Sequence, residues 1–447
     1  MANILCFGAV VAIFYWLSVF ATMFPHIHSE PDAQPTDQFK PCGDVGGMCR
    51  CHGTIADCSE NYDGELTFIP YFSRPITKLI FSSNALRSID SDQFFWNVTE
   101  LTDLDISRNS LSYVSQGAFS VFKRLKTLDV QVHELNYSQL EQIFAIRTLE
   151  KLDLSNGDLG PLPDDLFYRY PLPKLEVLSL NENVLEFVNM TALKPLPSLK
   201  SFSVRAAWIR EVYSDHLPFL ELLDIGENTK GLVNFPKTCD GSGESFFPSL
   251  VYLDLGLSLF LPWSSESYLC LPRLTELYLD YNHIEEVNMT VFKYLGNLTQ
   301  LYLVSSQIHH INPAYLPSLE RLEVGDNSFS DFPATCSDHG QSFYPALSYL
   351  DLRSNRKRLV VSELDLCLPQ LKRLVLEDTE LGELNMTKFK SLTNLRGLYA
   401  GIAKITKLVF DFREAEHLEQ QNKRYSRNMF RGRPASPSTF VFFGSFF

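Results

Sequence analysis

Residues 245–255 read SFFPSLVYLDL, and residues 342–352 read SFYPALSYLDL. The same offset of 97 residues carries Cys239 onto Cys336, and a fainter third copy lies upstream of both. Unrelated stretches do not agree at so many positions over so long a span. The chain therefore contains a duplicated module, and the content of that module decides the fold.

Each module is built from shorter repeats of the form L-x-x-L-x-L-x-x-N, which follow one another at steps of 21 to 30 residues. This period and consensus are the signature of leucine-rich repeats. We therefore expect an α/β leucine-rich-repeat solenoid, a horseshoe with a parallel sheet on its concave side, in which fourteen repeats fill residues 76–410. The repeats start at Ile76, Leu101, Leu125, Leu149, Leu175, Leu199, Leu220, Leu250, Leu274, Leu298, Leu319, Leu347, Leu371 and Leu395.

Four positions of the repeat have predictable roles. The first, fourth and sixth residues are apolar and alternate with polar ones, which is the pattern of a half-buried strand. The ninth residue is usually Asn, Ser or Thr, as at Asn109 and Asn282. Such a side chain can satisfy the backbone groups that are freed where the strand turns away. Stacked repeats should therefore contain a polar ladder.

The chain begins with an apolar run over residues 4–24. We interpret residues 1–24 as a signal peptide that is removed on export. The run is also long enough to span a bilayer, so an uncleaved anchor is the alternative. Both interpretations place the repeats in the lumen of the secretory pathway or outside the cell, and a longer product would be membrane-bound.

Four cysteines precede the first repeat with the spacing C-x6-C-x-C-x6-C. We expect residues 42–75 to form a disulfide-stapled cap, because the first repeat would otherwise expose its core and an open strand edge. A zinc site that includes His52 is the alternative, but C-x-C spacing suits a tetrahedral site poorly and exported thiols oxidise. The cysteines of the cap are Cys42, Cys49, Cys51 and Cys58.

Four further cysteines lie at near-equivalent positions of adjacent long repeats. Such positions should lie about one strand spacing apart, within the range that a disulfide tolerates. The spacing predicts the pairs Cys239–Cys270 and Cys336–Cys367, each closing the base of a loop. Buried free thiols are the alternative.

Six Asn-x-Ser/Thr sequons support an exported chain, because they are glycan acceptors in that compartment. They are Asn97, Asn136, Asn189, Asn288, Asn297 and Asn385. Beyond the repeats, residues 411–447 keep no repeat spacing and contain no cysteine. We expect this tail to be disordered, either as a natural alternative ending or through an error in the gene structure.

The composition restricts the function. A net charge of −14 and a pI near 5.2 disfavour nucleic acid as a partner, since phosphate binding requires a basic surface. The sequence contains no phosphate-binding loop, nucleophile elbow or paired metal ligands, so we expect no enzyme, cofactor or metal. The histidine cluster His283, His309 and His310 is either an inert surface feature or a pH sensor.

The outward strand positions should form the concave face, which solenoids use for binding. Asp105, Asp129 and Asp153 occupy the fifth position of successive repeats, and Lys78 and Lys151 on the same face should offset their repulsion. Later repeats carry Tyr and Arg, which dominate interface hot spots. They predict a contact patch, although these side chains could merely fill the surface. The patch consists of Tyr252, Tyr278, Tyr281, Tyr302, Arg321, Tyr349, Arg353 and Arg373.

The export signal, the cysteine cap, repeats such as LTELYLDYNHIEEV (274–287), the sequons and the long cysteine-bracketed repeats together resemble the extracellular domain of Toll-like receptors. The similarity covers residues 42–410. It implies recognition of microbial or endogenous ligands in innate immunity, with a protein partner and with pairing as a homodimer or heterodimer. The sequence departs from the family in having no C-terminal cap, membrane span or cytoplasmic signalling domain.

A second interpretation is a secreted leucine-rich-repeat protein that acts in adhesion, in the matrix or as a decoy. It shares the cap, the repeat period and the sequons with the receptor interpretation. The ligand itself cannot be named from the residues.

Overall fold

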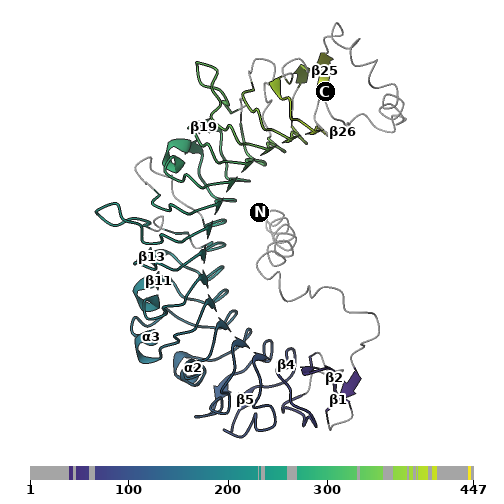
Figure 1. Ribbon diagram of the computed structural model, residues 1–447, viewed down its shortest axis with the longest axis vertical. Helices are drawn as coiled ribbons and strands as arrows, with labels where there is room; N and C mark the ends of the chain where they lie inside the picture. The colour runs from purple at the N-terminus through teal and green to yellow at the C-terminus, as the bar shows by residue number, and fades with distance from the viewer. Residues whose placement is uncertain are drawn as a thin grey trace, which may run out of the picture.

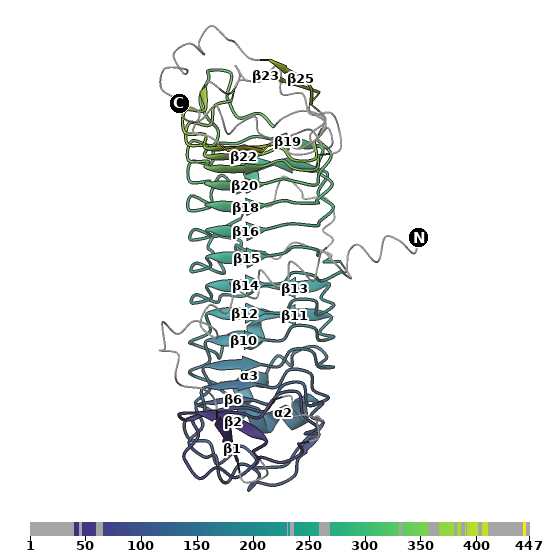
Figure 2. The same ribbon diagram turned by 90° about the vertical axis from the view of Figure 1, so that its right-hand side faces the viewer.

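The computed structural model is a curved solenoid (Figure 1). Its coiled repeats stack side by side (Figure 2), with one strand of each on the concave side and loops, short helices and short strands on the convex side. The structure describes residues 40–43, 47–59, 66–229, 231–232, 237–258, 269–329, 333–355, 366–379, 382–385, 389, 391–400, 405–409 and 441–443. The expected signal peptide lies outside these residues.

The concave sheet contains one strand from each repeat, and successive strands pair in parallel, as the sequence predicts. Each strand has a buried central residue, Leu in all but one, and in most strands the first and third residues are more exposed, because side chains alternate between the faces of a sheet. The strands are β4 (Lys78–Ile80), β6 (Asp103–Asp105), β8 (Thr127–Asp129), β9 (Lys151–Asp153), β10 (Val177–Ser179), β12 (Ser201–Ser203), β14 (Leu222–Asp224), β15 (Tyr252–Asp254), β16 (Glu276–Tyr278), β18 (Gln300–Tyr302), β20 (Arg321–Glu323), β21 (Tyr349–Asp351), β22 (Arg373–Val375) and β24 (Gly397–Tyr399).

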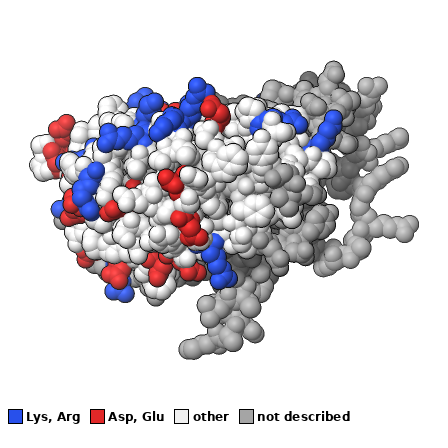
Figure 3. Space-filling view, turned by 90° about the horizontal axis from the view of Figure 1, so that it is seen from below, with Lys and Arg blue, Asp and Glu red and all other residues white. Residues whose placement is uncertain are grey.

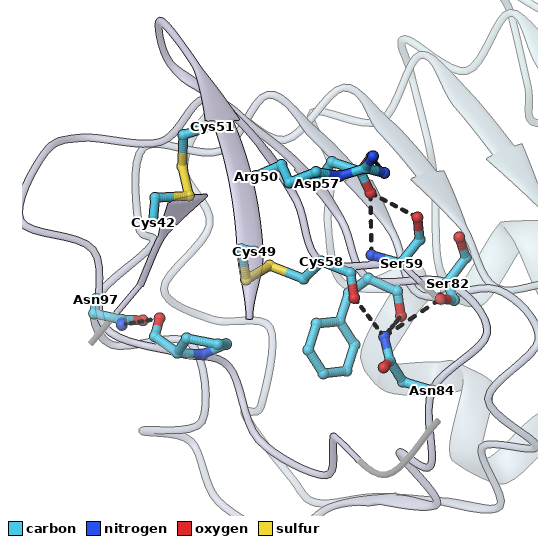
Figure 4. The surroundings of a disulfide bond; sticks show 12 residues. Cys42, Cys49, Arg50, Cys51, Asp57, Cys58, Ser59, Ser82, Asn84 and Asn97 are labelled. Atoms are coloured by element: carbon cyan, nitrogen blue, oxygen red, sulfur yellow. Dashed lines mark hydrogen bonds and ion pairs between the residues drawn. A yellow bond between two sulfur atoms is a disulfide. The ribbon is translucent and has the colours of Figure 1, made fainter. Parts of the chain in front are cut away.

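Three antiparallel strands cap the N-terminal end of this sheet: β1 (Lys40–Cys42), β2 (Cys49–His52) and β3 (Ile55–Asp57). Strand β3 pairs in parallel with β4, so the cap continues the sheet and covers the edge of the first repeat. Disulfides Cys42–Cys51 and Cys49–Cys58 staple the three strands (Figure 4). The structure therefore has the cysteine cap that the spacing predicted, and it pairs these cysteines with each other rather than around a metal.

The turn after each concave strand combines a left-handed backbone with a polar ladder. The eighth residue of the repeat has a φ between 51° and 61° in thirteen repeats, for example 54° at Arg108. The following Asn109 is buried, donates to the carbonyl oxygens of Phe81 (2.8 Å) and Ile106 (3.0 Å), and accepts from the amide of Leu86 (3.1 Å). Because these bonds reach the preceding repeat as well as its own turn, the ladder joins neighbouring repeats.

One rung of the ladder has an unexpected composition. His133 occupies the ninth position of the third repeat and is buried, with its Nδ1 accepting from the amide of Leu135 at 3.0 Å. The next rung is Gly157, where an added Cβ would lie 2.6 Å from the His133 ring. The glycine therefore makes room for the imidazole, and Asn183 in the following repeat continues the ladder by accepting from Leu159. Burial lowers the pKa of His133.

The convex side carries short elements. Pairs of parallel strands recur there: β5 (Ser88–Ile89) with β7 (Tyr113–Val114), β11 (Phe187–Asn189) with β13 (Glu211–Tyr213), β17 (Glu286–Asn288) with β19 (His310–Asn312), and β23 (Gly382–Asn385) with β25 (Ile405–Val409). The helical segments are α2 (Tyr137–Phe144), α3 (Leu166–Arg169), η1 (Met190–Leu193) and η2 (Met289–Phe292). Helix α2 begins at Asn136, whose side chain accepts from the amide of Gln139.

The two long repeats are clamped as their spacing predicts. Disulfides join Cys239 to Cys270 and Cys336 to Cys367, with Cα atoms 5.4 Å and 5.2 Å apart. Antiparallel bridges close a hairpin just after the first cysteine of each pair, between Cys239 and Ser245 and at the equivalent residues of the second. Each disulfide therefore fixes the base of a hairpin to the following repeat.

Part of the expected tail is structured. Strand β26 (Val441–Phe443) pairs antiparallel with β24 at the end of the concave sheet, a contact that repeat spacing does not predict. The remaining tail residues lie outside those that the structure describes. Among the described residues, no helix has the length and apolar character needed to cross a membrane.

Candidate ligand-binding surface

A continuous row of aromatic and arginine side chains crosses the concave face. Strands β15, β16, β18, β20 and β21 contribute to it. Register pairing places Tyr278 opposite Tyr302 and Arg321 opposite Tyr349, about one strand spacing apart, and the other neighbours in the row are diagonal to one another. The row consists of Tyr252, Tyr278, Tyr302, Arg321 and Tyr349, followed by Arg353 just beyond β21.

The contacts along the row are close. The rings of Tyr278 and Tyr302 are nearly parallel, with centroids 4.2 Å apart and an interplanar angle of 5°, and the ring of Tyr252 lies 5.1 Å from that of Tyr278. The guanidinium of Arg321 lies 3.8 Å from the centroid of Tyr349 and 5.9 Å from that of Tyr302. Stacking and cation–π contacts hold these side chains in one arrangement, so a ligand would meet a preorganised surface.

Carboxylates neutralise both arginines of the row. The Nε of Arg321 donates to Glu323 at 2.7 Å, and the Nε of Arg353 donates to Asp351 at 2.7 Å. The row therefore does not offer an uncompensated cation to a phosphate group. The charged side chains visible from the N-terminal end of the solenoid are likewise of both signs (Figure 3).

The tyrosine hydroxyls are also oriented. They donate to side chains two residues away on the same strand: Tyr278 to Glu276 at 3.1 Å, Tyr302 to Gln300 at 2.7 Å and Tyr349 to Asp351 at 3.2 Å. Burial raises the pKa of Tyr302, and burial together with Asp351 raises that of Tyr349. These hydroxyls therefore stay protonated at neutral pH, and the surface presents hydroxyls, carboxylates and ring edges.

A buried ionic cluster adjoins the tyrosine end of the row. Arg205 lies against the backbone of Gly226 and donates to Asp254 at 2.8 Å and Glu227 at 2.8 Å, with Asp224 at 3.4 Å. Burial opposes the charge on Arg205, but the three carboxylates outweigh it and raise its pKa. Burial and Asp254 raise the pKa of Asp224 to about 6. This cluster was not predicted from the sequence. Its signal there is an Arg at the seventh position of one repeat, Arg205, followed by Asp at the fifth position of the next two, Asp224 and Asp254.

The aspartates of the early repeats form a structural ladder. Asp105, Asp129 and Asp153 are register partners on β6, β8 and β9. The Nε2 of Gln131 donates to both Asp129 (3.1 Å) and Asp153 (3.0 Å). That Lys78 and Lys151 offset the repulsion stays a prediction; among the contacts of the described residues, it is Gln131 that bridges two of these carboxylates. Burial and the two neighbouring carboxylates raise the pKa of Asp129 to about 8.

Two members of the predicted patch do not join the row. Tyr281 lies in the turn after β16 with a φ of 60°, and Arg373 on β22 forms no ion pair or ring contact among the described residues. The pH-sensing role considered for His283, His309 and His310 stays a prediction. His309 contacts Glu286 at 3.4 Å and His310 contacts Asn312 at 3.0 Å, both at the convex strands β17 and β19.

The sequons occupy different surroundings. Asn97 donates to the carbonyl of Pro70 at 2.8 Å and buries its Oδ1, while Asn297 donates to the carbonyl of Pro272 at 2.7 Å (Figure 4 shows Asn97). Asn136 caps α2. The remaining three occur at the same place in successive modules, at the end of convex strands β11, β17 and β23: Asn189, Asn288 and Asn385.

Known proteins share this repeat and its curvature. The Leucine rich repeat family matches residues 74–132, 147–206 and 272–329. Toll-like receptor 3 of Bos taurus is 26% identical over 279 residues, which cover 57% of this chain and 30% of the receptor. The solved complex of Toll with Spatzle from Drosophila aligns with a TM-score of 0.55 at 19% identity, over 74% of this chain and 45% of that one, and shares the fold.

The chain contains leucine-rich repeats and is similar in sequence to Toll-like receptor 3. This leucine-rich-repeat domain is also similar to Tsukushi of Gallus gallus, with 26% identity over 252 residues that cover 55% of this chain and 66% of Tsukushi. The aligned region spans about a third of the length of the receptor it matches. Two kinds of relative, a receptor and Tsukushi, are therefore similar to this chain.

Proposed function

We propose that this leucine-rich-repeat domain is the extracellular, ligand-binding part of an innate-immune receptor. The row from Tyr252 to Arg353 supports the proposal, because Tyr and Arg side chains held in fixed contact on a concave face are typical of interface hot spots. Similarity to Toll-like receptor 3 supports the receptor role, and the Toll–Spatzle complex shows that a domain with this fold takes a protein partner.

The chemistry of the row favours a protein or other hydrogen-bonding ligand over nucleic acid. Its arginines are already paired with Glu323 and Asp351, and the whole chain has a net charge of −14. Phosphate backbones are bound by cations that release counterions, and this row does not supply them. Hydroxyls and carboxylates suit a partner that carries amide, hydroxyl or cationic groups.

A cell-based receptor chimera tests the proposal. The chain is joined to a membrane span and signalling domain of Toll-like receptor 3, and reporter output is measured with a panel of microbial extracts. Tyr278→Ala/Tyr302→Ala should weaken the response to an active extract about tenfold or more, because two stacked hot-spot rings are lost. Tyr294→Ala, which removes an exposed ring outside the row, is the matched control. A response unchanged by the double substitution, or absent from every extract, contradicts the proposal.

The second candidate is a secreted repeat protein of the adhesion, matrix or decoy kind. The observation that favours it is the similarity to Tsukushi, of which the aligned region covers 66%. Fractionation of cells that express the native transcript separates the two candidates. A receptor remains with the membranes, whereas a secreted protein accumulates in the medium.

A further inference from the structure

An exposed aromatic pair lies beside a sequon on the convex side. Strands β11 and β13 pair in parallel there (Figure 1), with Asn189 opposite Tyr213 and Phe187 opposite Glu211. The alternate residue Val188 is buried, so these four side chains share the outward face of the pair. Phe187 is 37% exposed and Tyr213 53% exposed. Large apolar side chains grouped at the surface often mark a site that another molecule or group covers.

The two rings are held in place. Their centroids are 6.1 Å apart in an edge-to-face arrangement, and the hydroxyl of Tyr213 donates to the carboxylate of Glu211 on the same strand. Phe187 precedes the sequon asparagine by two residues, so its side chain leaves the strand on the same side. The rings therefore stand on two sides of Asn189.

The amide of Asn189 has a fixed orientation. Its Oδ1 accepts from the backbone amide of Thr191 at 3.1 Å, and its Nδ2 donates to Asp164 at 2.8 Å. A glycosylated amide keeps one N–H, so the bond to Asp164 can persist after modification. The first sugar is thus attached to a rigid support rather than to a freely rotating side chain.

We propose that Asn189 carries an N-linked glycan whose first N-acetylglucosamine packs its apolar ring face against Phe187 and Tyr213. In the transfer, the Nδ2–C1 bond forms, the bond from C1 to the phosphate of a lipid-linked oligosaccharide diphosphate breaks, and the amide loses one proton. The contact removes exposed aromatic surface from water, which is the source of its stability. The proposal requires export of the chain but not the receptor function.

The next module supplies an internal comparison. Strands β17 and β19 have the same register around Asn288, but Glu286 and Asn312 replace Phe187 and Tyr213. This outward face carries the imidazole of His310 beside Asn312, and no phenyl or phenol ring among its register partners. A pocket of about 320 Å³ adjoins it, and its lining combines Glu286, Asn288 and Asn312 with buried apolar side chains such as Val287 and Phe292. The chain therefore presents two equivalent sequons, one flanked by Phe and Tyr rings and one without them.

The rate of enzymatic glycan release distinguishes the sequon at Asn189 from the one at Asn288. The full chain is secreted from animal cells and treated with peptide N-glycosidase without denaturation, and release is followed at each site by mass spectrometry as conversion of Asn to Asp. A sugar that packs on the rings must leave them before the enzyme can act. Release at Asn189 should therefore be about five- to tenfold slower than at Asn288.

Reciprocal substitutions test the cause. Phe187→Ala/Tyr213→Ala should bring the release rate at Asn189 to that at Asn288, and Glu286→Phe/Asn312→Tyr should slow release at Asn288. These side chains lie at the surface, and an unchanged melting temperature verifies the fold. A protein that is unoccupied at Asn189, equal rates at the two sites, or a slow rate that survives the double alanine substitution would each overturn the proposal.

Discussion

Replacement of Asp129 by Asn should flatten the pH dependence of stability. In the folded chain, burial and the carboxylates of Asp153 and Asp105 raise the pKa of Asp129 to about 8, whereas an unfolded aspartate titrates near 3.9. Between these values the folded chain retains a proton that the unfolded chain has lost. Stability contributed by this group is thus complete below about pH 4 and is lost as the pH rises toward 8.

The size of the effect follows from the spacing of the ladder. Two carboxylates on neighbouring strands about 5 Å apart repel by about 3 kcal/mol at the effective dielectric constant of a protein surface. Asparagine at this position removes the charge. It also loses the 3.1 Å hydrogen bond that Gln131 Nε2 donates to Asp129 Oδ2, because the asparagine amide would place an N–H donor opposite the Gln131 donor. A net gain of about 2 kcal/mol at pH 8 and little or none at pH 4 is expected.

Thermal unfolding at pH 4, 6 and 8 measures this gain in stability. Asp129→Asn should melt about 4 °C above the parent chain at pH 8, and the two should converge at pH 4. Asp92→Asn, which changes an exposed aspartate, is the control and should shift neither the melting temperature nor its pH dependence. A variant whose melting temperature keeps the parent's slope from pH 4 to pH 8 would refute the electrostatic account of the ladder.

Three more substitutions probe other features. Arg205→Met should cost about 3 to 5 kcal/mol at pH 7, because Asp224 and Asp254 remain buried without their cation. Chemical denaturation should show a smaller cost at pH 4, below the pKa of about 6 to which burial and Asp254 raise Asp224. Asn228→Ala should lower the free energy of unfolding by about 2 to 4 kcal/mol, because this fully buried side chain binds backbone groups of two repeats. Amide hydrogen exchange should become faster in both repeats. Faster exchange in only one of them would argue against a ladder that joins repeats. Removal of the Cys239–Cys270 disulfide in a Cys239→Ser/Cys270→Ser variant should lower the free energy of unfolding by about 3 to 4 kcal/mol, because the disulfide closes a loop with a sequence separation of 31. An unchanged denaturation midpoint would show that the disulfide does not stabilise the fold.

The sequence predicts those features that the repeat itself dictates. Periodic leucines fix the strand, the ninth residue fixes the ladder, and the register of neighbouring repeats brings Cys336 within reach of Cys367. The same register brings Tyr278 onto Tyr302. These inferences succeed because each depends only on position within a repeat.

Contacts that span several repeats through long side chains were not predictable in this way. Arg205 reaches Asp254 two strands away because Gly226 leaves space between them. Gln131 bridges Asp129 and Asp153, and its reach depends on a rotamer that no spacing rule gives. Phe187 and Tyr213 lie beside Asn189 because the convex strands β11 and β13 pair in parallel, which repeat spacing alone does not predict.

The two disulfide clamps also set how far the chain can be stretched. A force applied to the ends can peel repeats apart one after another, but the segment closed by each disulfide, with a sequence separation of 31, cannot lengthen. At about 3.4 Å per residue, each clamp withholds roughly 100 Å of contour length. The duplicated module therefore has a covalent limit to its extension, set by redox state rather than by the strength of its packing.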